Sequence, residues 1–228
     1  MKLVYFADKH NEFGRKLEIH MEDKTCGIET ISHMQFYNGV QAVRCWTDVK
    51  NVGTEPQGLE YVSSFALTGI EKEGMLSTDD KMRVWYPHNG WQREMQWESY
   101  TFPQLGLARC QPEEIQRSSK VIGATNIGNW STKEYLPMGL LENTETGSNL
   151  FWQIEHNGSW HWEISDQMGN FYIQLSGPTE TESHWWKNLQ PGETFTTVPV
   201  CVGSTLGKFD DAMGELTKYR RMIRRKNA

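Results

Sequence analysis

The sequence predicts an all-β protein: a large antiparallel β-sandwich, or supersandwich, followed by one C-terminal α-helix. Segments rich in β-branched and aromatic residues recur along the chain, and Gly, Pro and Asn residues between them supply turns. Helical periodicity over several turns occurs in one stretch near the C-terminus. A chain of 228 residues can bury a core without disulfides or metals. We therefore expect one β-domain over residues 1–209 and a helix within residues 210–228.

Two segments in the first third of the chain carry clear strand signals. Residues 40–49 are rich in β-branched side chains, and residues 59–67 alternate between two sets of side chains with period two. The segment 51–58 between them contains turn-forming Asn, Gly and Pro. This pattern predicts an antiparallel pair of strands. Further strands are expected at residues 81–86, 135–141, 170–175 and 194–201.

The segment 150–164 is the most informative part of the chain. Two aromatic-rich runs flank Asn157 and Gly158, a dipeptide that tolerates positive φ at both central turn positions. It predicts a β-hairpin with a type I′ turn, in which Ile154 lies opposite His161. Aromatic side chains then fall on both faces of the hairpin. We expect a second sheet or another domain to cover each face.

The predicted C-terminal helix runs over residues 210–225. Acidic residues open it and arginines close it, as the helix dipole favours. Its apolar stripe recurs at three- and four-residue steps and comprises Phe209, Ala212, Met213, Leu216, Tyr219 and Ile223. We expect this stripe to dock on the sandwich, because an isolated helix of this length is marginal in water. The helix is interpreted as a connector to a further domain.

Composition argues against several classes of function. The formal net charge of −6 disfavours nucleic acid as a partner, and the basic run at 220–226 is interpreted as a helix end. The N-terminus lacks the apolar region of a signal peptide, and no stretch is long enough to cross a membrane. The cysteines, Cys26, Cys45, Cys110 and Cys201, are scattered as expected for buried thiols in a reducing compartment. A cytoplasmic location is expected.

The sequence contains no self-sufficient active site. Spacing singles out no pair among four candidate glycosidase carboxylates, Glu94, Glu98, Glu155 and Glu163. His156 and His161 have no further ligand at metal-binding spacing and are interpreted as hydrogen-bonded sheet histidines. Motifs for a serine nucleophile, a phosphate loop or a dinucleotide do not occur. We expect no catalytic residue, no metal and no cofactor.

The ten tryptophans are the positive anomaly of the composition. Most are expected in the core, but indole faces also stack on sugars, and carboxylates accept hydrogen bonds from sugar hydroxyls. The segment 87–111 is polar, aromatic and irregular, and is predicted to be a long loop. Its Trp91, Glu94 and Trp97 are the candidate substrate-binding residues. The alternative is that Trp91 anchors the core.

Seven runs of the sequence together carry a resemblance to one known family. The runs are WTDVKNVG (46–53), LEYVSSF (59–65), HNGWQRE (88–94), GNWSTKEYLP (128–137), WQIEHNGSW (152–160), LSGP (175–178) and YRR (219–221). They resemble the N-terminal domain of the α-galactosidases of glycoside hydrolase family 36. The resemblance covers nearly the whole chain.

This resemblance implies a β-supersandwich that precedes a catalytic (β/α)8 barrel, with the terminal helix leading into that barrel. Similar family members are retaining hydrolases of terminal α-galactosides that use two barrel aspartates. Their nucleophile motif, Lys-Trp-Asp, does not occur here, so no catalytic residue is carried over. The implied partners are the barrel of the same parent chain, α-galactoside oligosaccharides and further copies in a homo-oligomer. The loop with Trp91 and Glu94 is expected to approach the sugar pocket.

Two other classes of function stay open. One is a free-standing carbohydrate-binding module, for which the tryptophan content would be the cause, and the other is an unrelated structural sandwich. Coding sequence beyond Ala228 separates them, because a barrel with Lys-Trp-Asp supports the galactosidase interpretation. The sequence does not specify which α-galactoside is cleaved, or whether the parent hydrolyses or transfers.

Overall fold

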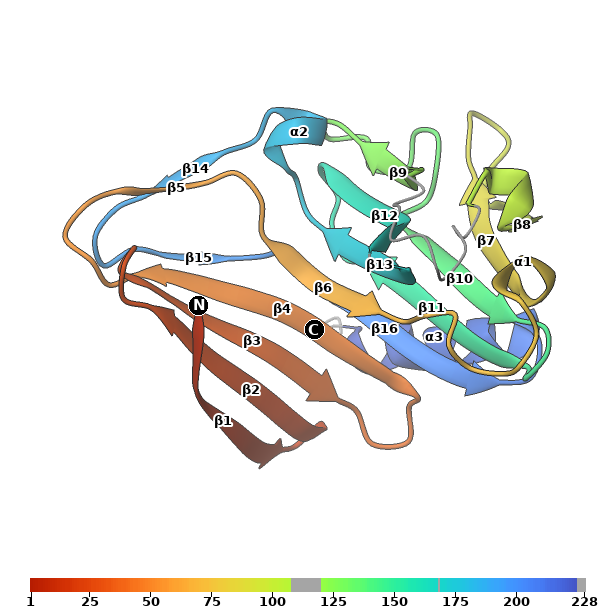
Figure 1. Ribbon diagram of the computed structural model, residues 1–228, viewed down its shortest axis with the longest axis horizontal. Coiled ribbons are helices and arrows are strands. Elements are labelled where there is room, and N and C mark those ends of the chain that lie inside the picture. Colours follow the sequence, from red (N-terminus) through yellow and green to blue (C-terminus); the bar gives the residue numbers. More distant parts are fainter. Residues whose placement is uncertain (108–119, 168, 225–228) are drawn as a thin grey trace.

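The computed structural model describes residues 1–107, 120–167 and 169–224. Its two main antiparallel β-sheets form a sandwich, and a helix lies behind the larger sheet (Figure 1). The larger sheet has ten strands. They are β1 (Lys2–Asn11), β2 (Gly14–Asp23), β3 (Ile28–Phe36), β4 (Ala42–Asn51), β7 (Met82–His88), β8 (Gln96–Thr101), β10 (Met138–Asn143), β11 (Ser148–Ile154), β15 (Thr194–Thr196) and β16 (Val200–Leu206). Their order is β1-β2-β3-β4-β16-β11-β10-β7-β8, with β15 beside β4.

The smaller sheet has four strands. In spatial order they are β6 (Ser63–Thr68), β13 (Asn170–Ser176), β12 (Trp160–Gln167) and β9 (Ile122–Asn126). The remaining elements are the strand pair β5 (Gln57–Leu59) and β14 (Lys187–Leu189), the short helices α1 (Thr78–Lys81), η1 (Pro103–Leu105) and α2 (Glu180–Ser183), and the long helix α3 (Phe209–Ile223). The prediction of an all-β sandwich with one C-terminal α-helix is confirmed.

The main core lies between the two sheets. Trp152 on β11 and Trp162 on β12 meet there edge to face, with ring centroids 5.2 Å apart, and both are buried. Trp160, also on β12, is buried beside them, and its ring N–H donates to the carbonyl of Ser131 at 2.8 Å. Gly139 on β10 leaves room for Trp152, because a Cβ at this position would lie 2.3 Å from the indole. Large aromatic side chains therefore fill the space between the sheets.

The predicted hairpin at 150–164 is wrong in its pairing. β11 pairs with β10 and β16 in the larger sheet, whereas β12 pairs with β9 and β13 in the smaller sheet. The chain between β11 and β12 crosses from one sheet to the other, and neither Asn157 nor Gly158 has a positive φ. Both faces of β11 are apolar because Trp152 packs between the sheets and Phe151 packs toward α3. The two strands thus lie in opposite layers.

Other local predictions of strand pairing and strand bounds are also wrong. The pair expected between residues 40–49 and 59–67 does not form, because β4 pairs with β3 and β16 while β6 pairs with β13. The strand expected at 194–201 is two strands, β15 and β16. The loop expected over 87–111 contains β8, which forms a hairpin with β7. Its residues 108–111, with Cys110, lie outside the described part of the chain.

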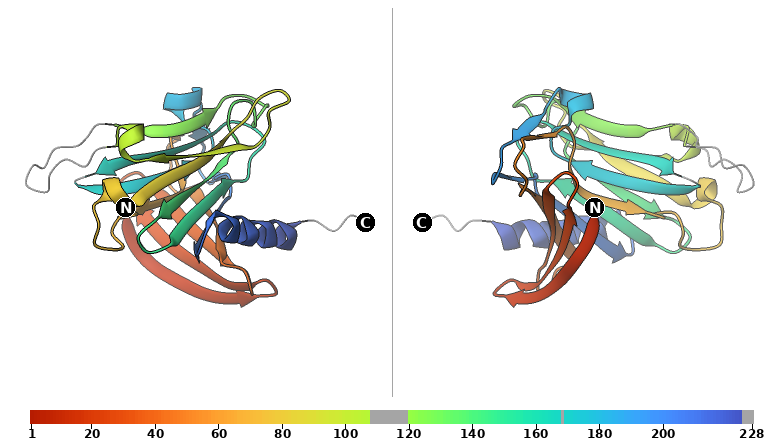
Figure 2. Two further views of the ribbon diagram at one scale, coloured as in Figure 1. Left: turned by 90° about the vertical axis from the view of Figure 1, so that its right-hand side faces the viewer. Right: turned by 60° about the vertical axis from the view of Figure 1, so that its left-hand side comes forward.

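Helix α3 lies on the face of the larger sheet that points away from the smaller sheet (Figure 2). Leu216 and Tyr219 are buried against β16, β11 and β4. The Tyr219 hydroxyl donates to the carboxylate of Glu155, which also pairs with Arg44 at 2.7 Å. At the start of the helix, the Asp211 side chain accepts a hydrogen bond from the Lys208 backbone N–H at 2.7 Å. The predicted docking of the apolar stripe is confirmed.

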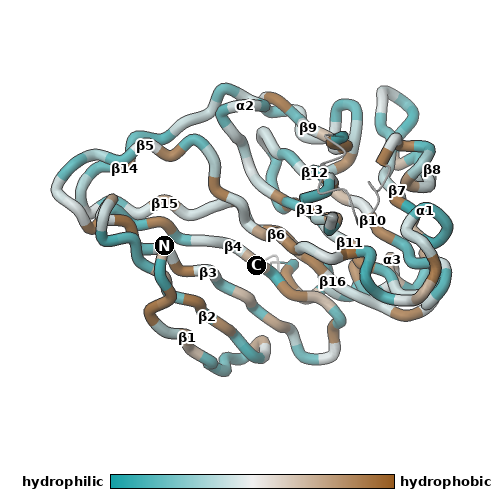
Figure 3. The backbone as a smooth tube through the Cα atoms, in the orientation of Figure 1, coloured by the Kyte–Doolittle hydropathy of each residue, from teal (hydrophilic) through white to brown (hydrophobic). Residues whose placement is uncertain are grey.

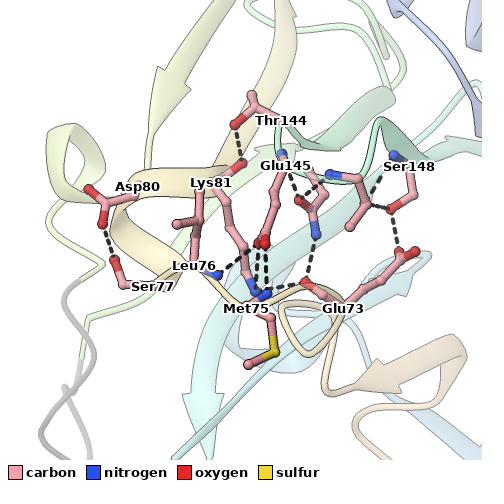
Figure 4. A network of polar contacts seen from close by, with 11 residues as sticks. Glu73, Met75, Leu76, Ser77, Asp80, Lys81, Thr144, Glu145 and Ser148 are labelled. Carbon is pink, nitrogen blue, oxygen red and sulfur yellow. Dashed lines mark hydrogen bonds and ion pairs between the residues drawn. The ribbon is translucent and has the colours of Figure 1, made fainter.

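A polar network holds the loop that precedes α1 against the turn between β10 and β11 (Figure 4). Glu145 accepts hydrogen bonds from the backbone N–H groups of Met75 and Leu76, at 2.8 and 2.9 Å, which lowers its pKa. Lys81 is buried, and its ammonium donates to the carbonyl of Glu73 at 2.7 Å. These contacts fix the loop and present the Met75 side chain to solvent.

No helix of the described residues is long and apolar enough to cross a membrane.

Strands β1, β2 and β3 extend beyond the smaller sheet (Figure 1). Their side chains are mostly exposed or half-buried, in contrast to those of β10, β11 and β16. The sequence interpretation assigned no strand to residues 1–39, although Leu17, Ile19 and Met21 alternate with polar residues in β2. One part of the larger sheet is therefore covered on both faces, by the smaller sheet and by α3. The other part, β1 to β3, lies beyond both of these layers.

Candidate functional site

The loop between β7 and β8 presents Trp91 to solvent. The Trp91 side chain is 82% exposed, so it does not anchor the core. Gln92 and Met95 have φ values of 59° and 58°, a left-handed conformation that is costly for residues with a side chain. Glu94 lies in the same loop and is also exposed. The loop is thus a strained turn that displays an indole and a carboxylate.

Asn89 fixes this loop to the neighbouring segment 127–137. Its backbone N–H donates to the carbonyl of Glu134 at 2.8 Å, and its side-chain amide donates to the carbonyl of Thr132. The Asn89 side-chain oxygen accepts from the Met95 backbone N–H at 3.0 Å. Because the bonds close the loop at both ends, the loop has a defined position on the sandwich.

Trp97 occupies a different environment from Trp91 and Glu94. It lies on β8, is half-buried, and its ring meets the Phe209 ring of α3 edge to face with centroids 5.0 Å apart. Trp85 contacts the same phenylalanine at 5.0 Å. The three predicted binding residues are therefore divided between the exposed loop and the contact with the terminal helix. Their role in binding stays a prediction.

A cleft of about 260 Å³ adjoins the Trp91 loop. It is lined by Thr125, Asn126, Ile127, Lys133, Glu134, Tyr135, Trp160 and Glu182. The segment 127–137, to which Asn89 is bound, supplies one wall, and it also carries the exposed Trp130. The cleft combines hydroxyl, amide, carboxylate and ammonium groups with an aromatic ring. The lining is therefore mostly polar, with Tyr135 and Trp160 as its aromatic members.

A row of hydrogen bonds supports the cleft from the outer face of the smaller sheet. The Thr125 hydroxyl and His161 Nδ1 are 2.7 Å apart, and His161 Nε2 lies 3.2 Å from a Glu163 carboxylate oxygen. Tyr172 donates to the other oxygen at 2.9 Å. The hydrogen bond from His161 holds the pKa of Glu163 below its usual value. His161 is therefore a hydrogen-bonded sheet histidine, as the sequence interpretation expected.

An aromatic cluster connects the β7–β8 hairpin to the segment 127–137. Tyr86 stacks on Tyr100 with centroids 5.3 Å apart, and Tyr135 of the cleft packs on Tyr86 and His88. Tyr100 donates to Glu98 at 2.5 Å, and this hydrogen bond raises the pKa of the tyrosine. These contacts join the cleft wall at Tyr135 to the β7–β8 hairpin that carries the Trp91 loop.

The four candidate carboxylates do not converge on one site. Glu155 is bound to Arg44 and Tyr219, Glu163 to His161 and Tyr172, and Glu98 to Tyr100. Glu94 stands alone in the exposed loop. In the part of the chain that the structure describes, no three His, Cys, Asp or Glu side chains are placed to hold a metal ion.

Sequence reasoning missed the cleft. Its lining comes from β9, from the segment 127–137, from β12 and from α2, which pairing of distant strands brings together. One signal was present, because the segment around Trp130 is polar, aromatic and irregular in the same way as the segment around Trp91. The exposure of Trp130 and its proximity to the Asn89 anchor are visible only in the folded chain.

The fold defines a class: a two-sheet antiparallel β-sandwich with a terminal helix on the outside of the larger sheet. No protein-family model and no curated protein matches this sequence. Solved structures do match. The α-galactosidase from Lactobacillus brevis matches with a TM-score of 0.77 and 13% identity, over 96% of this chain and 29% of its own.

Two α-galactosidases of family 36 from Geobacillus stearothermophilus match similarly. AgaB has a TM-score of 0.75 and 16% identity, over 96% of this chain and 29% of its own. AgaA has a TM-score of 0.73 and 16% identity, over 90% of this chain and 28% of its own, and a variant of it was solved with raffinose. This chain thus spans under a third of the length of these enzymes and shares the fold of that part. The resemblance found in the sequence is confirmed at the level of the fold.

Proposed function

We propose that this chain is the N-terminal, non-catalytic β-sandwich domain of a family 36 α-galactosidase. The observation that carries the proposal is the match over 96% of this chain to only 29% of an α-galactosidase. The seven sequence runs support the proposal independently, because they depend on residue identity and not on the fold. The parent enzyme is proposed to hydrolyse terminal α-galactosides with retention, on a barrel that lies outside these residues.

The proposed role of the domain follows from its two ordered surfaces. Helix α3 is packed firmly on the larger sheet, so a barrel that continues from it would be held in a fixed position relative to the sandwich. The loop with Trp91 and Glu94 is proposed to form one side of the sugar pocket. The exposed indole supplies a stacking face for the ring, and the carboxylate accepts hydrogen bonds from hydroxyl groups. Bond cleavage itself is assigned to the barrel.

The free thiols support the proposed cytoplasmic location. Cys45 and Cys201 are buried free thiols, and burial raises the pKa of Cys45 to about 12. Cys26 is exposed, so the expectation of a buried thiol is wrong at this position. Free thiols suit a reducing, cytoplasmic location. A homo-oligomer is proposed as the assembly, with α-galactoside oligosaccharides as the substrates.

A second candidate function is a free-standing carbohydrate-binding module. The cleft beside the Trp91 loop favours it, because polar groups and Tyr135 surround a volume of about 260 Å³ there. In that case the chain would bind oligosaccharides without a barrel.

Activity measurements separate the two functions. We expect the 228-residue chain, purified free of host enzyme, to be silent on nitrophenyl α-galactoside at every pH. We expect the product of the full coding region to cleave it. Turnover by the chain alone would contradict the assignment of catalysis to a barrel. A stop codon directly after Ala228 would exclude the domain proposal and leave the binding module.

A further inference from the structure

Asn157 and Gly158 form an exposed pair outside any hairpin turn. They lie in the connection that crosses from β11 to β12, and neither residue has the positive φ of a type I′ turn. This connection is hydrophilic, like most connections between strands in Figure 3. The Asn157 side chain is exposed to solvent. The fold therefore does not use the conformational preference of this dipeptide.

The groups of this pair that can react with each other are both unbonded. In an Asn-Gly pair the side-chain carbonyl carbon of the asparagine is within reach of the glycine nitrogen, and glycine has no Cβ to obstruct the approach. Neither the Asn157 side chain nor the Gly158 backbone N–H has a hydrogen-bond partner among the described residues. No bond has to break before the nitrogen meets the carbonyl carbon.

The connection is held on both sides of the pair. Before it, the Glu155 backbone N–H donates to the carbonyl of Pro199 at 2.9 Å. After it, the Ser159 hydroxyl oxygen accepts from the Gly128 backbone N–H at 3.0 Å. The unbonded groups thus lie in a short exposed stretch between two fixed points.

The chain contains two other Asn-Gly pairs, and Asn89-Gly90 is the closest match because both pairs follow a histidine. The Asn89 side-chain amide donates to the carbonyl of Thr132, and its side-chain oxygen accepts from the Met95 backbone N–H at 3.0 Å. Both bonds must break before this side chain can turn toward the glycine nitrogen. Asn89 is therefore protected by the fold.

The third pair, Asn38-Gly39, is restrained through its backbone. The Val40 N–H donates to the carbonyl of Tyr37 at 3.2 Å and closes a turn around the pair. The Asn38 N–H donates to the carbonyl of Phe13 at 2.9 Å. The turn restricts the approach of the glycine nitrogen to the side chain.

We propose that Asn157 is a site of spontaneous deamidation that yields an isoaspartyl link to Gly158. The Gly158 nitrogen bonds to Cγ of Asn157, and the side-chain amide leaves as ammonia with the proton from that nitrogen. Water then opens the resulting succinimide at one of its two carbonyl carbons and gives aspartate or isoaspartate. Either product adds one negative charge to the formal net charge of −6. The isoaspartyl form also has an extra methylene group in its backbone.

The modification would change one wall of the cleft. The Gly158 carbonyl accepts from the side-chain amide of Asn126 at 3.1 Å, and Asn126 lines the cleft. A longer backbone displaces this carbonyl and removes a restraint on Asn126. The inference does not depend on the galactosidase assignment.

Peptide mapping of the 228-residue chain after incubation in mildly alkaline buffer tests the site. Mass spectrometry separates the amide from the acid, and an isoaspartyl-specific carboxyl methyltransferase with labelled S-adenosylmethionine marks isoaspartate. We expect Asn157 to react at least about tenfold faster than Asn89, because two hydrogen bonds must break at Asn89. In concentrated urea the two rates should become similar. Equal rates in the folded chain, or no isoaspartate at residue 157, would overturn the proposal.

Substitution of the glycine tests the reaction path. Gly158→Ala should slow the reaction at Asn157 about tenfold, because the new methyl group obstructs the nitrogen. The matched control Gly90→Ala has open space around its methyl group and should leave the rate at Asn157 unchanged. The new Cβ of Gly158→Ala lies 2.6 Å from the His156 ring, so melting temperatures check the fold of both variants. An unchanged rate in a folded Gly158→Ala would contradict attack by the Gly158 nitrogen.

Discussion

The tryptophans between the two sheets and the tryptophan in the β7–β8 loop are held in opposite ways. Trp152 and Trp162 lie on paired strands and are enclosed by side chains from both sheets. Trp91 is held through the backbone of its loop, and its ring is exposed. Burial of an indole stabilises the fold, whereas an ordered exposed indole is available for contact with a ligand. The amino-acid composition does not distinguish the buried tryptophans from the exposed one.

The largest expected loss of stability follows from a substitution of a tryptophan between the two sheets. Trp152→Ala should lower the free energy of unfolding by about 3 to 5 kcal/mol, because it leaves a cavity between the sheets that the surrounding strands cannot fill. Urea unfolding followed by tryptophan fluorescence and circular dichroism measures it. A loss below about 1 kcal/mol would mean that the space between the sheets is not close-packed.

The contact between α3 and the larger sheet should also be sensitive. Leu216→Asp should cost about 2 to 4 kcal/mol, from lost packing and a buried charge without a partner. The matched control is Met222→Asp on the exposed side of the same helix, which should change the free energy of unfolding by less than about 0.5 kcal/mol. Thermal unfolding of both variants measures the difference. Equal effects would show that α3 is not docked as described.

Substitutions at two glycines test the packing around Trp152 and the stability of α3 without removing any side chain. Gly139→Ala should destabilise by about 1 to 3 kcal/mol, because the new Cβ pushes on the Trp152 indole. Gly214→Ala, in α3 with open space around the new methyl group, should stabilise by about 0.5 to 1 kcal/mol. Melting temperatures of the two variants should therefore move in opposite directions. A neutral Gly139→Ala would contradict the tight contact with Trp152.

The smallest effect on stability is expected for the loop. Trp91→Ala should change the free energy of unfolding by less than about 0.5 kcal/mol, because the ring is exposed. In the full-length enzyme it should lower kcat/KM about ten- to a hundredfold, which corresponds to about 1.4 to 2.7 kcal/mol of transition-state binding. Both quantities are measured on the same variant. A large loss of melting temperature with unchanged kinetics per folded molecule would end the pocket hypothesis.

The candidate site was partly predictable from the sequence. Polar and aromatic residues without periodicity placed Trp91 and Glu94 in a loop, and both are exposed there. Trp97 follows in the same run, but strand pairing with β7 begins at Gln96 and turns it toward α3. The cleft was not predictable, because Thr125, Tyr135 and Glu182 reach it from separate elements.

The sequence by itself determined the class of fold, helix α3 with its buried stripe, and the strand segments from β4 onward that alternate clearly, but not β1, β2, β3 or β8. These features follow from local periodicity, since the backbone geometry of a helix or strand repeats within a few residues. Only the tertiary structure decided which strands pair, that β11 and β12 lie in opposite sheets, and that β1 is an edge strand of the larger sheet. The physical reason is that backbone hydrogen bonds are the same for any two strands. The choice of partner therefore depends on side chains, such as Trp152 and Trp162, that meet only after distant segments have come together.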